Sequence, residues 1–188
     1  MTLVGLGAAL AFGYGALPTF LYETAEQPLE FSHAIHMGEE GGMSCEDCHG
    51  FRADGSFVGI PPTSACADCH AEPMGESAAE KSLVENYLGP GKEIPWLVYS
   101  RQPDNVFFPH AAHVKIGKIE CTHCHGDHGK TDKLRSHQRN KLTGYSRDIW
   151  GSSITGLKTN SFDRMKMDDC VACHDEHDVD DSCLMCHK

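Results

Sequence analysis

The stretch FFPHAAHVKIGKIECTHCHG, from Phe107 to Gly126, places two histidines three residues apart ahead of a C-x-x-C-H sequence. The two histidines are His110 and His113, and the C-x-x-C-H sequence ends at His125. The same arrangement occurs earlier in EFSHAIHMGEEGGMSCEDCHG, from Glu30 to Gly50. This repeated association of F-x-H-x-x-H with C-x-x-C-H indicates that both parts belong to one kind of site.

All ten cysteines of the chain fall into C-x-x-C pairs, and a histidine directly follows each pair. The pairs are Cys45/Cys48, Cys66/Cys69, Cys121/Cys124, Cys170/Cys173 and Cys183/Cys186, followed by His49, His70, His125, His174 and His187. C-x-x-C-H is typical of c-type haem attachment. Two thiols reach the two vinyl groups of one porphyrin, and the histidine ligates the iron from the proximal side. We therefore expect five covalently bound c-type haems.

Three other kinds of site also use C-x-x-C pairs. The spacing of the first two pairs suits a zinc ribbon, and a single pair suits a redox dithiol or a disulfide framework. None of these sites requires a histidine after every pair. Because no cysteine lies outside the five motifs, haem attachment accounts for the pattern best.

The composition leaves little protein for each haem. Residues 23–188 provide about 33 residues per haem, too few to build an ordinary apolar core around each cofactor. Aromatic residues make up only 8% of the chain, and there are 19 glycines and 9 prolines. We expect a mostly irregular multihaem cytochrome c domain with short α-helices, very little strand and a core packed with haem, preceded by one N-terminal transmembrane helix.

Eight histidines remain as candidates for the distal iron ligands. Residues three apart lie on the same side of a helical turn, so the histidines of one F-x-H-x-x-H can serve two adjacent haems. This predicts distal ligation by His33, His36, His110 and His113. His128, His137 and His177 are the further candidates for a fifth distal ligand, whereas His123 lies inside its own motif and is expected to be a bystander.

F-x-H-x-x-H ahead of C-x-x-C-H resembles the tri- and tetrahaem periplasmic cytochromes. In that class the first histidine serves the haem that follows, and the second serves another haem. Three more stretches are GIPPTSACADCH (59–70), IPWLVYSRQPDNVFFPHAAHV (94–114) and MDDCVACH (167–174). With them, residues 30–188 resemble the multihaem cytochrome subunits of alternative complex III and, more closely, of the menaquinone reductase complex Qrc. The Qrc resemblance implies six haems, so a sixth haem would be held without two thioethers.

The first 22 residues, MTLVGLGAALAFGYGALPTFLY, carry no charge. They meet the rough threshold of about 18 apolar residues for a membrane span. A cleaved signal peptide is the alternative, but no basic region precedes the apolar run. We expect residues 1–22 to anchor a periplasmic domain, residues 23–188. Small residues spaced by four, such as Gly5, Ala9 and Gly13, favour close approach of a helix from an integral membrane partner.

Charge is unevenly distributed along the chain. The net charge of −11 argues against nucleic acid as a partner. Basic residues concentrate between Lys115 and Arg147, and acidic residues between Asp168 and Asp181. We expect the acidic block to steer a basic soluble cytochrome. The basic block would face an acidic partner subunit or anionic lipid headgroups.

No arrangement of residues typical of substrate catalysis occurs in the sequence, so the chain is not expected to be an enzyme by itself. The resemblance implies a relay between a soluble periplasmic tetrahaem cytochrome, as electron donor, and a menaquinone reductase with an integral membrane quinone-binding subunit. Its place would be the periplasmic side of the bacterial cytoplasmic membrane. Two alternatives remain: the same relay running outward from quinol, as in alternative complex III, and a self-contained anchored quinol dehydrogenase.

Overall fold

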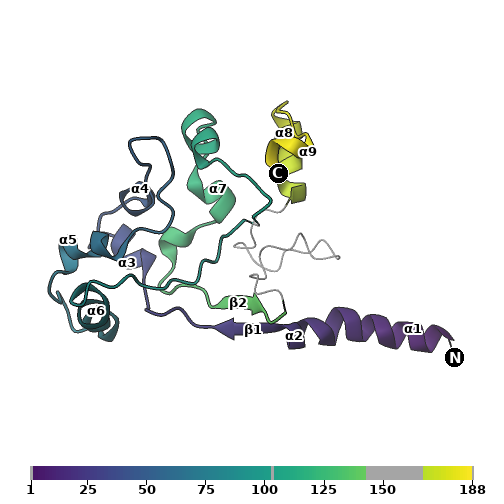
Figure 1. Cartoon of the computed structure of the whole chain (residues 1–188), viewed down its shortest axis with the longest axis horizontal. Helices are drawn as coiled ribbons and strands as arrows, with labels where there is room; N and C mark the ends of the chain where they lie inside the picture. The colour runs from purple at the N-terminus through teal and green to yellow at the C-terminus, as the bar shows by residue number, and fades with distance from the viewer. Residues whose placement is uncertain (1, 103, 143–166, 188) are drawn as a thin grey trace.

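The computed structural model describes residues 2–102, 104–142 and 167–187. Short helices joined by long irregular connections make up most of this part of the chain (Figure 1). The α-helices are α1 (Thr2–Ala11), α2 (Leu17–Leu21), α3 (His33–Met37), α4 (Cys45–Cys48), α5 (Ala67–His70), α6 (Ala78–Leu83), α7 (Cys121–His125), α8 (Met167–Glu176) and α9 (Cys183–Cys186). Further helical turns span Phe12–Ala16, Thr63–Cys66, Val84–Leu88, Ala111–Ile116 and His128–Lys130. The expectation of short helices and little strand is confirmed.

Each C-x-x-C-H motif lies on helical backbone: the second spans the 3-10 turn Thr63–Cys66 and α5, and the fourth lies within α8. At α4, the Asp47 carboxylate accepts hydrogen bonds from the Ser44 N–H, at 2.6 Å, and from the Ser44 hydroxyl, at 2.8 Å. At α7, the helix ends at Gly126, whose φ of 73° lies in the region that favours glycine. The two thiols of a motif are therefore presented on a single helical turn.

One small antiparallel sheet joins the N-terminal region to a distant segment. Strand β1 (Tyr22–Ala25) pairs with β2 (His137–Asn140), with Tyr22 opposite Asn140. The sequence analysis did not predict these strands, because neither alternates apolar and polar residues. Ion pairs between Arg139 and Glu23 and between Lys133 and Glu30 run alongside. Part of the expected basic docking surface is thus used within the chain; Arg147 lies outside the described residues.

Within the described residues, the polypeptide makes a small apolar core. Leu29, Leu83 and Ile94 are buried together, and Cys66 and Trp96 pack against them. The accessible surface is 13160 Å², whereas a compact monomer of this mass exposes about 9000 Å². Such an open chain agrees with the expectation that large prosthetic groups fill much of the interior.

The N-terminal segment differs from the single transmembrane helix expected over residues 1–22. In the part of the chain that the structure describes, no helix combines the length and apolar composition needed to cross a membrane. The helical backbone changes to a π-helical turn at Phe12, and β1 begins at Tyr22, directly after α2. The apolar side chains of α1 are exposed, with Leu3 at 82%.

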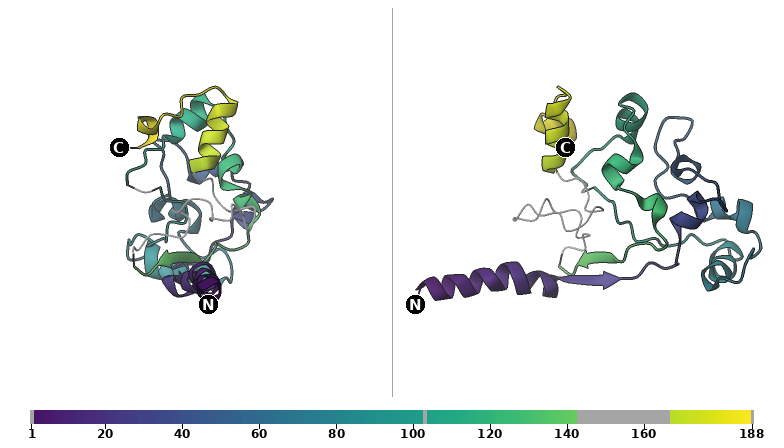
Figure 2. Two further views of the ribbon diagram at one scale, coloured as in Figure 1. Left: turned by 90° about the vertical axis from the view of Figure 1, so that its right-hand side faces the viewer. Right: turned by 180° about the vertical axis from the view of Figure 1, so that it is seen from behind.

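The termini of the described chain lie at different edges of the molecule. Helix α1 projects from the body, whereas α8 and α9 lie together at the opposite edge in every view (Figures 1 and 2). A backbone hydrogen bond from Phe107 to Cys186, at 2.7 Å, ties α9 to the segment that precedes His110. The last two C-x-x-C-H motifs are thereby held beside the second F-x-H-x-x-H segment.

Candidate haem-binding site

Thiols of different C-x-x-C-H motifs lie close together, in an order that differs from their order in the chain. The neighbouring thiols are Cys66 and Cys48, Cys45 and Cys121, Cys124 and Cys170, and Cys170 and Cys186. In space the motifs therefore form one series: second, first, third, fourth and fifth. Groups held by neighbouring members of this series would themselves be neighbours.

Cys69 and Cys173, two thiols of the predicted attachment set, have contrasting surroundings. Like Cys183 in the fifth motif, Cys69 is exposed. Its motif is at one end of the series, so no further motif in the described part of the chain covers it. Cys173 is half-buried in α8 and lies near the thiols of Cys124 and Cys170. Haem attachment by Cys69 and Cys173 stays a prediction that rests on their C-x-x-C-H motifs.

Five of the ten thiols are not activated for redox chemistry. All ten cysteines are free. Burial raises the pKa of five of them, and neighbouring thiols or carboxylates raise it further: Cys48, Cys66, Cys121, Cys124 and Cys170. Redox dithiols rely on a lowered thiol pKa. The redox-dithiol alternative is therefore disfavoured for these motifs.

The two F-x-H-x-x-H segments have nearly identical local geometry. Phe31 stacks on His36, with ring centroids 4.4 Å apart, and meets the edge of His33 at 5.0 Å. Phe108 likewise stacks on His113 at 4.4 Å, and its edge contact with His110 is 4.9 Å. The phenylalanine thus orients both histidines of its segment, which explains why it recurs in the motif.

Each of three motif histidines faces a histidine from an F-x-H-x-x-H segment. The ring centroids are 6.0 Å apart for His36 and His70, 6.3 Å for His110 and His125, and 6.1 Å for His113 and His174. The rings of His110 and His125 are almost parallel, with an interplanar angle of 4°. The structure therefore brings together the proximal and distal candidates that the sequence could not pair.

The distance between the paired ring centroids can be compared with the separation of two imidazoles bound to one metal. Two metal–nitrogen bonds of about 2 Å, with about 1 Å from each ring centroid to its nitrogen, place two imidazoles on one metal about 6 Å apart centre to centre. The three pairs match this value. The residues present thus fit haem iron with two axial histidines.

His33 has a second histidine neighbour besides His49, the motif histidine that the tri- and tetrahaem cytochromes suggest for it. Its ring lies 6.2 Å from that of His128, with the planes tilted by 50°, and neither residue belongs to a C-x-x-C-H motif. His49 is near enough to interact electrostatically with both. This histidine cluster is formed by the segments around α3, α4 and residues 128–130.

Hydrogen bonds at Nδ1 prepare several of these histidines to bind metal through Nε2. Backbone carbonyl oxygens lie near the Nδ1 atoms of four candidate ligands: His36 (Ser32 O, 2.7 Å), His49 (Gly59 O, 2.6 Å), His113 (Pro109 O, 3.0 Å) and His174 (Asp180 O, 3.2 Å). A carbonyl only accepts, so Nδ1 carries the proton and Nε2 presents its lone pair. Such partners fix the orientation of a metal-binding imidazole.

Burial favours the neutral form of three distal candidates, His33, His110 and His128. Burial first, and then the neighbouring His128, lower the pKa of His33 to about 4. Burial also lowers the pKa of His110 and of His128. A neutral imidazole is the form that binds a metal, so these histidines are in the ligating form at neutral pH.

The remaining histidines lie in different parts of the described chain. His137 is buried in β2, at 8% exposure, and His177 is exposed beyond the end of α8. His187 lies beside the segment containing Asn105. His123 is exposed, as its role of bystander predicts.

Zinc is the other metal that cysteine and histidine suggest. Structural zinc is held by four ligands, and catalytic zinc by at least three protein ligands. Across the residues that the structure describes, no group of three or more cysteine, histidine or acidic side chains is arranged to hold a metal ion. The paired histidines suit a cofactor that brings four equatorial ligands of its own.

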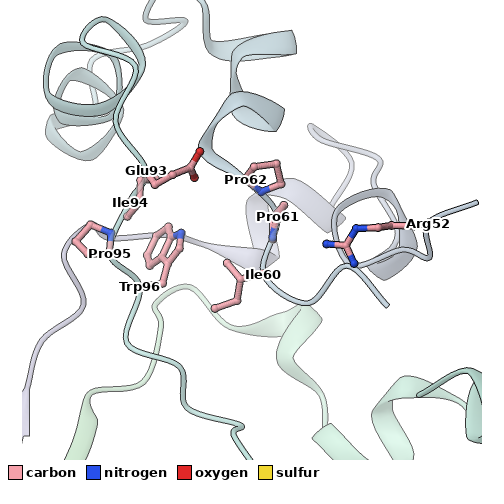
Figure 3. Close-up of a pocket in the computed structure, with 8 residues that line it drawn as sticks. All are labelled: Arg52, Ile60, Pro61, Pro62, Glu93, Ile94, Pro95 and Trp96. Atoms are coloured by element: carbon pink, nitrogen blue, oxygen red, sulfur yellow. The ribbon is translucent and has the colours of Figure 1, made fainter. Parts of the chain in front are cut away.

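An open pocket lies between two segments that position the first and second motifs (Figure 3). On one side, Pro61 and Pro62 follow Gly59, which accepts the hydrogen bond from His49. On the other side lie Glu93 and Trp96. Glu93 accepts a hydrogen bond from the Thr63 N–H at 2.8 Å, which crosslinks the two segments just before Cys66.

Sequence reasoning missed two contacts at the candidate site. Phe57 stacks on His110 at 4.1 Å, and the Glu80 carboxylate hydrogen-bonds the His70 ring at 2.8 Å. Neither residue belongs to a recognisable motif. Their contribution depends on tertiary contacts that a linear pattern does not record.

Comparison with known proteins adds a relative over almost the whole chain. No protein-family model matches. The menaquinone reductase multihaem cytochrome c subunit of Nitratidesulfovibrio vulgaris is 42% identical over 200 aligned positions, which cover 98% of this chain and 88% of the relative. This chain belongs to the family of menaquinone reductase multihaem cytochrome c subunits. The family membership agrees with the repeated C-x-x-C-H motifs and the facing histidines described above.

Proposed function

We propose that this chain is the electron-relay subunit of a membrane complex that reduces menaquinone. One observation carries the proposal. Three pairs of histidine rings face each other with centroids 6.0–6.3 Å apart, the separation of two imidazoles on one metal, and these pairs lie along one series of motifs. Haem iron, when bound, supplies one-electron chemistry. The protein supplies attachment, axial ligands and a fixed order of neighbouring sites. The name of the 42% identical relative supports menaquinone as the acceptor.

We assign the binding roles as follows. The ten motif cysteines, the exposed Cys69 included, attach five haems, and the motif histidines are the proximal ligands. His36, His110 and His113 are distal ligands opposite His70, His125 and His174. His33 and His128 share the neighbourhood of His49, so one of them completes that site. The other is available for a sixth haem, as the family resemblance implies.

The N-terminal segment is proposed to attach the chain to the membrane. Residues 1–22 carry no charge, and several apolar side chains there are exposed, including Leu3, Val4 and Phe20. We propose that this segment is the anchor and that it packs against an integral membrane quinone-binding subunit. Residues 23–188 would then lie on the periplasmic side, where c-type haems are attached.

A soluble periplasmic tetrahaem cytochrome is proposed as the electron donor. The acidic end of the chain supports this, because Asp175, Glu176, Asp178, Asp180 and Asp181 are all exposed around the last two motifs. Electrostatic complementarity raises the rate at which an oppositely charged partner associates. The reverse flow, outward from quinol, uses the same groups and remains the second candidate.

Purification of the complex through a tag on this chain tests the proposal. We expect an integral membrane subunit to copurify, and the complex to reduce a menaquinone analogue when supplied with a reduced periplasmic cytochrome. A chain that purifies alone and oxidises quinol unaided would instead be a self-contained quinol dehydrogenase. A complex that oxidises quinol but does not reduce quinone would favour the outward direction.

A further inference from the structure

The histidine of the second motif has a charged partner. The Nδ1 atom of His70 lies 2.8 Å from the Oε1 atom of Glu80, in the first turn of α6. Both side chains are largely removed from solvent, with 19% of His70 and 12% of Glu80 exposed. The contact is therefore a charge-assisted hydrogen bond in a partly dry setting, where such bonds are stronger than neutral ones.

Backbone groups hold the Glu80 carboxylate in place. Oε1 also accepts from the Met74 N–H at 2.8 Å, and Oε2 accepts from the Gly75 N–H at 3.0 Å. Two backbone N–H groups thus donate to the carboxylate, an arrangement that favours its ionised form. An ionised carboxylate only accepts, so His70 must donate from Nδ1.

Other candidate ligands use neutral partners instead. The Nδ1 atoms of His36, His49, His113 and His174 face backbone carbonyls, at 2.7, 2.6, 3.0 and 3.2 Å respectively. Opposite His70, the facing ring is that of His36. The second motif thus combines one ligand held by a carboxylate with one held by a carbonyl.

A carboxylate partner changes the ligand and not only its orientation. It draws the Nδ1 proton toward itself and makes the imidazole a stronger electron donor through Nε2. Electron donation to the iron stabilises the ferric state relative to the ferrous state. Hydrogen bonding around the axial ligand is one of the means by which a protein sets the potential of haem.

We propose that Glu80 is a tuning residue that lowers the reduction potential of the haem bound at His70. We expect this potential to be lower than it would be if His70 Nδ1 donated to a backbone carbonyl instead of to the Glu80 carboxylate. The inference rests on the proposed function, because it requires an iron between His70 and His36. The second motif stands at one end of the series of motifs, so its potential governs how readily an electron enters or leaves the relay there.

The test is a potentiometric titration of the complete, haem-loaded chain carrying Glu80→Gln. Glutamine keeps the length of the side chain, and its Oε1 can still accept from His70 and from the Met74 N–H. Its amide NH2 cannot accept from the Gly75 N–H, so the substitution removes the charge and one backbone hydrogen bond. We expect the midpoint potential of one haem to rise while the others keep theirs. The His36→Ala variant identifies that haem, because its low-spin signal should be the one that His36→Ala abolishes.

Glu76→Gln is the matched control. Glu76 lies in the same stretch, is 97% exposed and pairs with Lys81 rather than with a histidine. Glu76→Gln removes the same charge as Glu80→Gln but leaves the contact between Glu80 and His70 intact. All midpoint potentials should therefore stay unchanged in this variant. A shift of equal size in Glu76→Gln and Glu80→Gln would reduce the effect to overall charge and overturn the proposal.

Two further outcomes separate tuning from a structural role. If Glu80→Gln loses a haem, Glu80→Asp decides, because it keeps the charge but is too short to hold the same contact. A raised potential in Glu80→Asp supports tuning, whereas an unchanged potential contradicts it. If the wild-type chain has no low-spin haem that depends on His36, the proposed ligation by His36 is wrong. If that haem is present and its potential in Glu80→Gln equals that of wild type, the ligation stands and only the proposed role of Glu80 is wrong.

Discussion

At the scale of single residues, the two ring nitrogens of the candidate ligands have separate tasks. In His36 and His113, Nδ1 donates to the carbonyl four residues earlier, at 2.7 and 3.0 Å. This leaves Nε2 to face the opposite ring across about 6 Å, the separation of two imidazoles on one metal. The same tautomer is required at His70, where Glu80 is the acceptor.

Replacing His110 with alanine tests this assignment at one iron. The ring of His110 faces that of His125 at 6.3 Å, so His110→Ala should remove one axial ligand and convert one low-spin haem to high-spin. Electron paramagnetic resonance of the oxidised protein measures the change. His123→Ala is the control, because His123 is exposed and should alter no spin state. A fully low-spin spectrum in His110→Ala would refute the pairing.

At the scale of elements, the F-x-H-x-x-H segment acts as a unit in which one phenylalanine orients two histidines. Phe108 makes a stacked contact with His113 and an edge contact with His110. Because those histidines face His174 and His125 respectively, a single phenylalanine influences the third and the fourth motif. Phe31 has the same role toward His33 and His36.

Replacing Phe108 with leucine should therefore weaken two sites at once. Aromatic ring pairs contribute about 0.5–1.5 kcal/mol each beyond their buried area, and 1 kcal/mol shifts Tm by about 2–4 °C in a protein of this size. We expect the low-spin spectrum of the Phe108→Leu variant to be lost a few degrees below wild type on heating. Phe20→Leu, in the exposed N-terminal segment, should leave that temperature unchanged; equal shifts in both variants would contradict the orienting role.

Sequence reasoning reached the local features of this site but not its long-range partners. Spacing alone indicated that His110 and His113 share one side of a turn. It carried no information on which motif each one faces, because His113 and His174 are brought together only by the tertiary fold. Glu80 was missed for the same reason. The β1–β2 pair was missed because its strands come from distant parts of the chain and do not show an alternating apolar pattern.

At the scale of the whole molecule, some charged side chains form ion pairs within the chain, and others are exposed to solvent. Lys133 and Arg139 pair with Glu30 and Glu23, so these cations serve to fasten the N-terminal region. The acids of the C-terminal end, by contrast, are exposed around α9. This asymmetry makes the acidic end the better candidate for a docking surface.

The triple variant Asp178→Asn, Asp180→Asn and Asp181→Asn tests that surface. It should slow reduction by a basic periplasmic cytochrome and flatten the dependence of the rate on salt, which screens charges over about 10 Å at 0.1 M. Stopped-flow absorbance measures the rate, and a small uncharged reductant should react as with wild type. The control removes three exposed acids elsewhere, in Glu39→Gln, Glu40→Gln and Glu72→Gln. Normal low-salt rates in the Asp variant would show that the donor docks elsewhere.

The central claim is that this chain holds its haems covalently through five C-x-x-C-H motifs. The most direct test is the intact mass of the denatured, purified chain, combined with quantitative release of haem that is not covalently bound. We predict a mass equal to the polypeptide plus five haems, and a sixth haem, if present, should dissociate on denaturation. A mass that accounts for four or fewer haems would contradict the account.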